Sequence, residues 1–181
     1  MIITLAGPIG SGKTTLARAI AAKLDAPSAG FGNYVRSLAE KRGLDIGRRQ
    51  VLQDLGHELV LADPRGFLDD ALAWGGHVPG QNLLLDGLRH ITILEALRQR
   101  EAEGLDDVTL LYLDTPASVR RTRVAARGVS VGQMEADEAH PAERDLDQRL
   151  RAAADYVLDG AKPIETLTED ALLLITRRRS D

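Results

Sequence analysis

The 181-residue sequence contains no cysteine. Disulfide bonds, thiol catalysis and cysteine-ligated zinc are therefore excluded for this chain, and the absence fits a reducing compartment such as the cytoplasm. Aromatic residues make up only 3% of the sequence. Because 44% of the residues are nevertheless hydrophobic, we expect a core built mainly from Leu, Val, Ile and Ala. The length is that of a single domain.

Several partner classes also lack their usual sequence signals. The net charge of −4 argues against a general nucleic-acid-binding surface. The apolar runs are too short to span a membrane, and the N-terminus lacks a basic region followed by an apolar segment. The four histidines form no H-x-x-x-H pair, which gives little support to a zinc site. We expect a cytoplasmic protein that acts on a small molecule; the oligomeric state is left open.

The most informative segment is the run from Gly7 to Thr14, which reads GPIGSGKT. A short apolar β-type run precedes it, and a segment with helical apolar spacing follows it. This is the context of a phosphate-binding P-loop, in which glycines let backbone N–H groups surround an anion at a helix N-terminus. We expect Lys13 to reach the β- and γ-phosphates of ATP and the Thr14 hydroxyl to hold Mg²⁺. The predicted ATP-binding residues are Gly7, Gly10, Ser11, Gly12, Lys13, Thr14 and Thr15.

Strand-like and helix-like segments alternate along the chain, which predicts an α/β protein. We expect a three-layer α/β/α P-loop NTPase fold with a mainly parallel, five-stranded sheet. The expected strands are 2–6, 27–31, 82–86, 108–114 and 156–158. The expected helices are 13–24, 33–42, 48–61, 65–74, 90–103, 116–127, 139–152 and 165–176. Within a single domain over 1–181, residues 32–75 form a helical insertion, and 128–142 form a short polar loop that acts as a lid.

Asp86 ends the apolar run Leu83-Leu84-Leu85. A carboxylate at the end of a strand is common and can simply precede a turn. In a P-loop protein, however, an aspartate at this place orients the magnesium ion, often through water. We therefore predict a metal site formed by Thr14 and Asp86.

The segments Gly32-Asn33-Tyr34-Val35-Arg36 and Asp86-Gly87-Leu88-Arg89 resemble two segments of the nucleoside monophosphate kinases, adenylate kinase above all. In that family, arginines after the second and third strands grip the phosphate of the acceptor. The resemblance implies that Arg36 and Arg89 bind the acceptor, and a guanidinium suits this task because its planar fork matches phosphate oxygens.

A third segment carries the same resemblance, namely Asp114-Thr115-Pro116 followed by Arg123 and Arg127. Residues four apart share one face of a helix, so Arg123 and Arg127 can point together at the ATP phosphates. The resemblance places such an arginine pair at the edge of the lid. We therefore assign catalytic roles to Lys13, Arg123 and Arg127.

The resemblance implies an ATP-dependent kinase that transfers the γ-phosphoryl group to a nucleoside or deoxynucleoside monophosphate. There are departures: Asn33 stands where these kinases usually have Asp, and no proline precedes Arg89. The segment from His140 to Asp159 is also similar to dephospho-CoA kinase, so a hydroxyl acceptor is one alternative. A nucleotide-binding regulator without phosphotransfer is another. A GTPase is set aside because neither asparagine begins an Asn-Lys-x-Asp motif.

Overall fold

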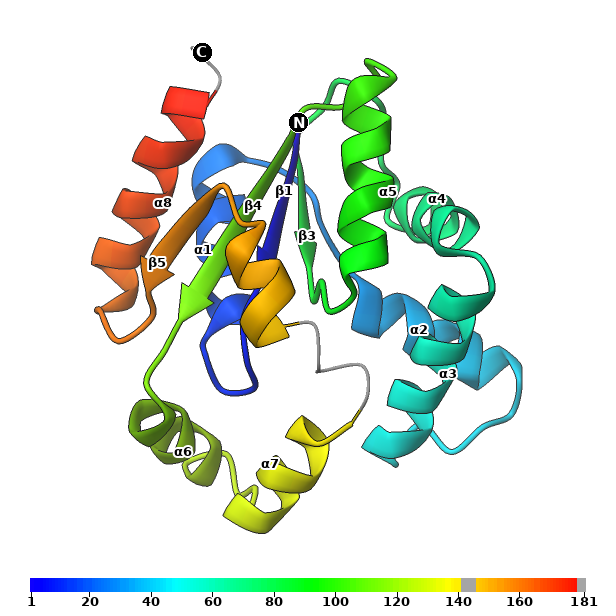
Figure 1. Ribbon diagram of the computed structural model, residues 1–181, viewed down its shortest axis with the longest axis vertical. Helices are drawn as coiled ribbons and strands as arrows, with labels where there is room; N and C mark the ends of the chain where they lie inside the picture. Colours follow the sequence, from blue (N-terminus) through cyan, green and yellow to red (C-terminus); the bar gives the residue numbers. More distant parts are fainter. Residues whose placement is uncertain (141–145, 179–181) are drawn as a thin grey trace.

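The computed structural model describes residues 1–140 and 146–178. Five parallel strands form one sheet in the order β2-β3-β1-β4-β5 (Figure 1). The predicted α/β fold with a parallel five-stranded sheet is therefore confirmed. The strands are β1 (Ile2–Ala6), β2 (Ser28–Gly30), β3 (Leu83–Asp86), β4 (Val108–Asp114) and β5 (Tyr156–Asp159).

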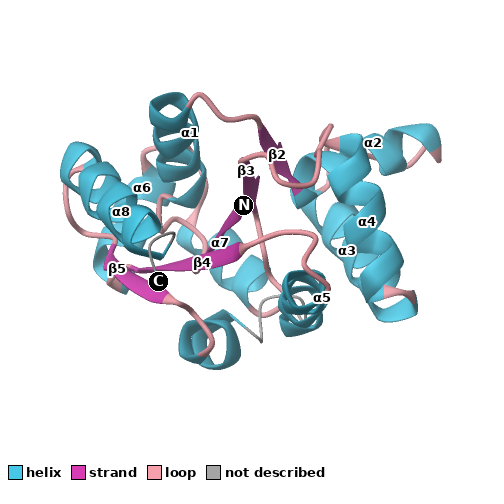
Figure 2. Ribbon diagram, turned by 90° about the horizontal axis from the view of Figure 1, so that it is seen from above, coloured by secondary structure: helices cyan, strands magenta, loops and turns pink. Residues whose placement is uncertain are grey.

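Helices cover both faces of the sheet, which Figure 2 shows from above. Helices α1 and α8 lie on one face, and α5 lies on the other beside the group α2 to α4. The helices are α1 (Lys13–Leu24), α2 (Phe31–Lys41), α3 (Arg49–Ala62), α4 (Pro64–Trp74), α5 (Ile91–Ala102), α6 (Ala117–Ala125), α7 (Val131–Glu138) and α8 (Ile164–Arg178), and a short π-helix, η2, spans Leu146–Leu150. No helix in the described part of the chain is long and apolar enough to cross a membrane.

The strands divide the apolar side chains between two cores. Because successive residues of a strand point to opposite faces, Ile3 and Leu5 pack into the core beneath α1 and α8, whereas Ile2 and Leu83 pack into the core beneath α2 to α5. All five residues of β1 are buried. Because helices cover both faces of the sheet, the central strands are almost continuously apolar. Because all the strands pair in parallel, their carboxyl ends lie at one edge of the sheet, where the P-loop follows β1.

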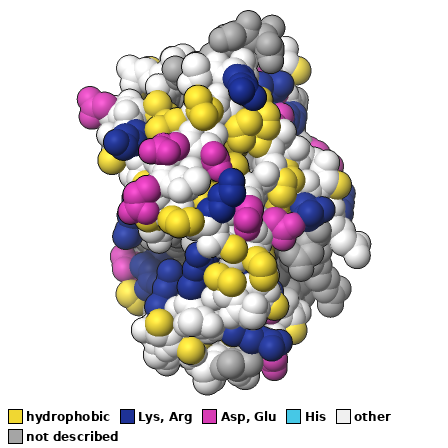
Figure 3. All heavy atoms as spheres, turned by 90° about the vertical axis from the view of Figure 1, so that its left-hand side faces the viewer, with side chains coloured by type: hydrophobic (Ala, Val, Ile, Leu, Met, Phe, Trp, Pro, Cys, Tyr) yellow, Lys and Arg dark blue, Asp and Glu magenta, His cyan; other side chains and the backbone are white. Residues whose placement is uncertain are grey.

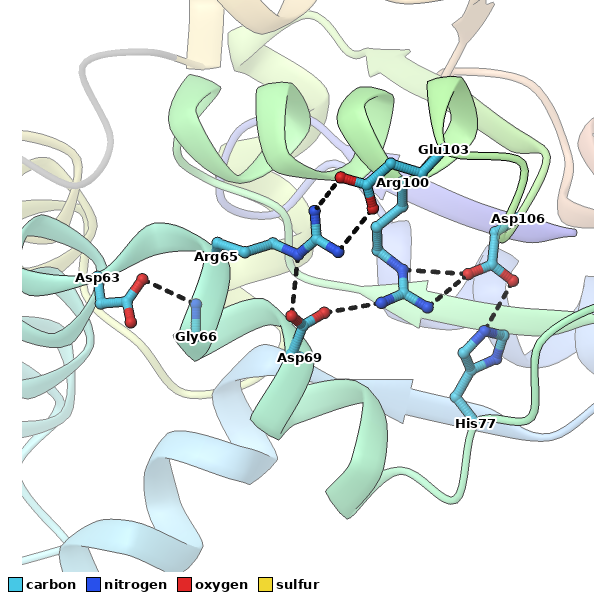
Figure 4. Close-up of polar contacts among 8 residues, drawn as sticks. All are labelled: Asp63, Arg65, Gly66, Asp69, His77, Arg100, Glu103 and Asp106. Carbon is cyan, nitrogen blue, oxygen red and sulfur yellow. Dashed lines mark hydrogen bonds and ion pairs between the residues drawn. The ribbon is translucent and has the colours of Figure 1, made fainter.

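The helical insertion is attached to the rest of the domain by ion pairs between α4 and α5 (Figure 4). Arg65 contacts Asp69 of its own helix at 2.9 Å and donates two hydrogen bonds to Glu103, which directly follows α5. These side chains are partly exposed to solvent. The outer part of the network therefore depends on solvent-screened interactions, which contribute little individually.

The inner part of this network is buried. Arg100 of α5 donates from Nε and Nη2 to one oxygen of Asp106, at 3.1 and 2.8 Å, and from Nη1 to Asp69. The other oxygen of Asp106 lies 2.8 Å from Nε2 of His77, in the loop that follows α4. The Asp106 side chain is fully buried. This cluster fixes α4 and its C-terminal loop to α5, and so fixes the base of the insertion.

The polar segment 128–142, expected as a loop, instead contains helix α7 over Val131–Glu138. Ser130 caps this helix by accepting a hydrogen bond from the backbone N–H of Gln133, and Met134 is buried beneath it. The polar composition of the segment obscured this cap and the buried Met134. Of the expected helix over 139–152, residues 139 and 140 follow the end of α7 and are not helical, 141–145 lie outside the described residues, and η2 begins at residue 146.

Candidate active site

The loop between β1 and α1 adopts a conformation that requires glycine at two positions. Gly7 has φ of 143°, and a Cβ there would lie 2.7 Å from the carbonyl oxygen of Leu113. Gly10 has φ of 79°, and a Cβ there would lie 2.9 Å from Val124. Gly12, in the left-handed conformation, precedes α1 without a side-chain cap. The loop is therefore held against β4 and α6, and the N-terminus of α1 faces the site with its N–H donors and positive dipole end.

Lys13 folds back over this loop. Its ammonium group donates to the carbonyl oxygens of Gly7 at 2.5 Å and Pro8 at 3.0 Å. Burial, and after it the positive charge of Arg89, lower the pKa of Lys13 to about 7, although Asp86 acts to raise it. An arriving anion would favour the charged ammonium form.

Thr14 and Asp86, the two residues proposed from the sequence to hold a metal, lie in contact at the edge of the sheet. The Thr14 hydroxyl donates a 2.6 Å hydrogen bond to Oδ2 of Asp86. The other carboxylate oxygen is buried and has no hydrogen-bond partner among the described residues. A hydroxyl beside a carboxylate is a donor set that suits Mg²⁺. Because the described residues contain no cluster of three or more His, Asp or Glu that could hold a metal, an ion here would need further oxygen ligands from phosphates or water.

Arginines of α6 lie beside the P-loop. Arg123 donates from Nη1 to the carbonyl oxygen of Ser11 at 2.9 Å. Arg127 is exposed and, with Arg123 and Lys162, lines a cavity of about 310 Å³ between the loop, α6 and the start of α8. Figure 3 shows Lys and Arg side chains gathered beside a hollow on the side of the molecule that faces left in Figure 1. Arg123 lies within α6, whereas Arg127 lies in the turn after it, because α6 ends at Ala125 and not at residue 127 as expected. The two arginines therefore reach the P-loop cavity from a helix and from the turn that follows it.

A second, larger cavity of about 550 Å³ lies between the insertion and the carboxyl ends of β2 and β3. Its lining includes both arginines that the sequence singled out for the acceptor, Arg36 and Arg89. Arg36 donates to the carbonyl oxygen of Ile46 and is otherwise exposed. Arg89 also lines the adjoining cavity that contains Lys13, Thr14 and Asp86. The two arginines thus share one cavity, and Arg89 reaches the P-loop as well.

Burial, and after it the charge of Arg49, lower the pKa of Arg89 to about 10, although Asp86 and Asp137 act to raise it. Arg89 remains charged at neutral pH. Three cationic side chains, Lys13, Arg49 and Arg89, therefore influence one another at the edge of the P-loop. Such a concentration of positive charge favours the binding of a polyanion.

Two further arginines of this site were not among the predicted site residues. Arg49 begins α3 and lines both the acceptor-side cavity and the P-loop cavity. Arg120 of α6 donates to the carbonyl oxygens of Ile9 and Thr115 and so holds the loop in place. Neither residue lies in a motif with fixed spacing from the P-loop. Their positions depend on how α3 and α6 pack, which only the folded chain shows.

Comparison with known proteins agrees with this geometry. Residues 3–143 match the family described as AAA domain. An adenylate kinase from Gemmatimonas aurantiaca is 30% identical over an alignment of 182 positions, which covers the whole of this chain and 75% of that protein. The chain belongs to the P-loop kinases of the AAA domain family, similar to the nucleoside monophosphate kinases. It is accordingly an ATP-dependent phosphotransferase, as the sequence predicted.

Other matches to this P-loop kinase cover only a short segment or have a lower sequence identity. A cytidylate kinase from Haloarcula marismortui is 50% identical over 44 residues, about a quarter of either chain. A shikimate kinase from Acinetobacter baumannii, solved in complex with shikimate, superimposes with a TM-score of 0.64 at 22% identity, covering 99% of this chain and 95% of that one. At this identity the likeness shows the fold alone. By their names, these kinases differ in the small molecule that accepts the phosphoryl group.

Proposed function

We propose that the chain transfers the γ-phosphoryl group of ATP, with Mg²⁺, to the phosphate of a nucleoside or deoxynucleoside monophosphate. The observation that carries this proposal is the lining of the 550 Å³ cavity. Its described lining residues include three arginines, Arg36, Arg49 and Arg89, and no Asp or Glu. Such a cavity attracts an acceptor that is already an anion. It offers no carboxylate to deprotonate a hydroxyl, and His57 and His90 are the side chains of its lining that could take up a proton.

The apolar part of the same cavity supports an acceptor that is more than a phosphate. Phe31, Val35, Leu52, Val60 and Phe67 line it from the insertion. Its volume lies in the range of cavities that hold small-molecule ligands. We assign the arginine end to the acceptor phosphate and the apolar end to the base and sugar.

The reaction requires positioning and charge neutralisation more than a covalent catalyst. An oxygen of the acceptor phosphate forms the new bond to the γ-phosphorus, the bond from that phosphorus to the β–γ bridging oxygen breaks, and ADP leaves with the electron pair. Lys13 and the N–H groups of the P-loop hold the donor phosphates, and Arg123 and Arg127 neutralise their charge. Arg36 and Arg89 orient the acceptor.

Thr14 and Asp86 would hold Mg²⁺ together with phosphate oxygens, and the ion would supply further neutralisation of the phosphate charge. We assign the segment 128–142, with α7, the role of a lid that excludes water and so limits wasteful hydrolysis of ATP. The insertion at 32–75 carries the acceptor side of the site.

A coupled assay of ADP release tests this proposal. The acceptors are the four common nucleoside monophosphates, the deoxynucleoside monophosphates, dephospho-CoA and shikimate, with an acceptor-free control and Lys13→Ala as the inactive control. We expect one or more monophosphates to stimulate ADP release strongly. Stimulation by a hydroxyl acceptor alone would replace the assigned substrate class. Equally slow release with every compound would instead indicate a nucleotide-binding regulator.

A further inference from the structure

Arg49 lies where three cavities of the molecule adjoin. It lines the acceptor-side cavity, the P-loop cavity of about 330 Å³ that contains Lys13 and Thr14, and a third cavity beneath α7. Its side chain is 43% exposed, so it is accessible to a ligand in any of them. Its charge lowers the pKa of both Lys13 and Arg89. Arg49 is therefore an acceptor-side arginine placed close to the donor phosphates.

The partner of Arg49 in this structure is an acidic residue of α7. Nε of Arg49 lies 2.9 Å from Oδ2 of Asp137, and Gln133 donates to Oδ1 of the same carboxylate at 2.9 Å. The Asp137 side chain is only 9% exposed. A nearly buried carboxylate thus occupies a position next to the P-loop where an anion is stabilised by arginine.

The next residue of α7 makes an equivalent contact. Glu138 forms an ion pair with Arg120, whose guanidinium also donates to the carbonyl oxygen of Ile9 in the P-loop. Two consecutive carboxylates of one helix therefore reach two arginines, one from α3 and one from α6. Phosphate oxygens that took the places of the two carboxylates would be bound by the same two arginines.

We propose that Arg49 is a catalytic residue that contacts the phosphoryl group in transit between donor and acceptor, and that Asp137 holds it until a phosphate displaces the carboxylate. The inference rests on the proposed phosphotransfer and adds a residue to it. A guanidinium between the two substrates neutralises charge that both contribute to the transition state. Because Asp137 belongs to α7, the contact between Arg49 and the phosphoryl group depends on the position of that helix.

The first test compares Arg49→Ala, Arg49→Lys and the control Arg48→Ala, a neighbouring exposed arginine. We expect Arg49→Ala to lower kcat by about 100-fold or more while the KM values for ATP and acceptor change by less than about threefold. Lysine should restore part of kcat because it keeps the charge but loses the fork. An unchanged kcat in Arg49→Ala would overturn the proposal, as would a loss in Arg48→Ala of the same size. Thermal melts show whether Arg49→Ala keeps its fold. If it does not, the kcat of Arg49→Lys alone decides the test.

The second test does not depend on the acceptor. Binding of inorganic pyrophosphate is measured by calorimetry for wild type, Asp137→Asn and the control Glu135→Gln, which removes an exposed charge from the same helix. We expect Asp137→Asn to bind pyrophosphate about tenfold more tightly, because Arg49 no longer has to leave a charged partner. Unchanged affinity in Asp137→Asn would overturn the displacement. If no monophosphate is phosphorylated, the proposed function fails, whereas this titration still decides whether Arg49 and Asp137 act as described.

Discussion

The hydroxyl of Thr14 donates a 2.6 Å hydrogen bond to the carboxylate of Asp86, a residue 72 positions away that ends the neighbouring strand. The contact joins the first turn of α1 to the carboxyl end of β3. It exists because β1 and β3 pair in parallel with Leu5 opposite Asp86, which brings the two strand ends to the same edge of the sheet. A helix start and a strand end thus form one oxygen-rich site.

This relationship predicts a specific effect on the magnesium requirement. Asp86→Asn keeps an acceptor for the Thr14 hydroxyl but removes the negative charge. We expect the Mg²⁺ concentration for half-maximal activity to rise by about 10- to 100-fold. The control is Asp114→Asn, which changes an exposed aspartate at the end of strand β4, on the other side of β1 from β3. An equal shift in both variants would show that Asp86 has no special relation to the metal.

Lys13→Ala should lower kcat by at least about 100-fold, because no other lysine of the loop can reach the donor phosphates. The lysine also donates to Gly7 and Pro8, so a circular dichroism melt must show that the fold persists. Lys23→Ala, an exposed change at the other end of α1, is the matched control. Near wild-type turnover in Lys13→Ala would contradict the assignment.

The lowered pKa of Lys13 also predicts a pH effect. In the fold this pKa is about 7, whereas its ordinary value is 10.5. Between these values the unfolded chain binds more protons, so the contribution of Lys13 makes the free energy of unfolding increase with pH across this window. The groups that act on Lys13 are Arg89, Asp86, Arg49 and Arg120.

ATP should reverse this shift, because its phosphates favour the charged ammonium. Binding at pH 8 should therefore take up close to one proton, which calorimetry in buffers of different ionisation enthalpy measures. In Lys13→Met the uptake should disappear. Proton uptake that persists in this variant would assign it to another group.

Arg36 and Arg89 should differ in their effects, although the sequence treats them alike. Arg36 lines only the acceptor-side cavity, whereas Arg89 lines the P-loop cavity as well. Arg36→Ala should raise the acceptor KM by about tenfold or more and leave ATP affinity unchanged, whereas Arg89→Ala should weaken both. The control is Arg42→Ala, which changes an exposed residue directly after the C-terminal end of the same helix, α2. If ATP affinity falls in Arg36→Ala and the acceptor KM does not, the cavities are assigned the wrong way round.

Much of the fold could be predicted because its signals are local. The glycine spacing of the P-loop and the buried run Leu83-Leu84-Leu85 each report on their own neighbourhood, and the parallel sheet follows from their alternation with helices. Helix α7 was missed because its start depends on one serine cap in a polar segment. The pairing of Arg49 with Asp137 could not be predicted, since it joins α3 to α7 across the site and no spacing encodes it.

The buried contact between Arg100 and Asp106 was equally invisible in the sequence, and it predicts the largest stability effect outside the site. Asp106→Asn removes the charge that two N–H groups of Arg100 and the ring of His77 face. Because the Asp106 side chain is fully buried, the guanidinium would lose its buried counter-charge and keep only the ion pair with the partly exposed Asp69. We expect the free energy of unfolding to fall by about 3–5 kcal/mol.

The matched control is Glu103→Gln, in the exposed part of the same network, where solvent screens the ion pair with Arg65. Urea denaturation should show a large fall in the midpoint for Asp106→Asn and little change for Glu103→Gln. The reason is that burial, more than the number of ion pairs, determines what the loss of one partner costs. Equal effects in the two variants would show that the buried contact does not hold α4 against α5. A stability loss in Asp106→Asn accompanied by a raised acceptor KM would further show that this attachment keeps the insertion in place for the acceptor.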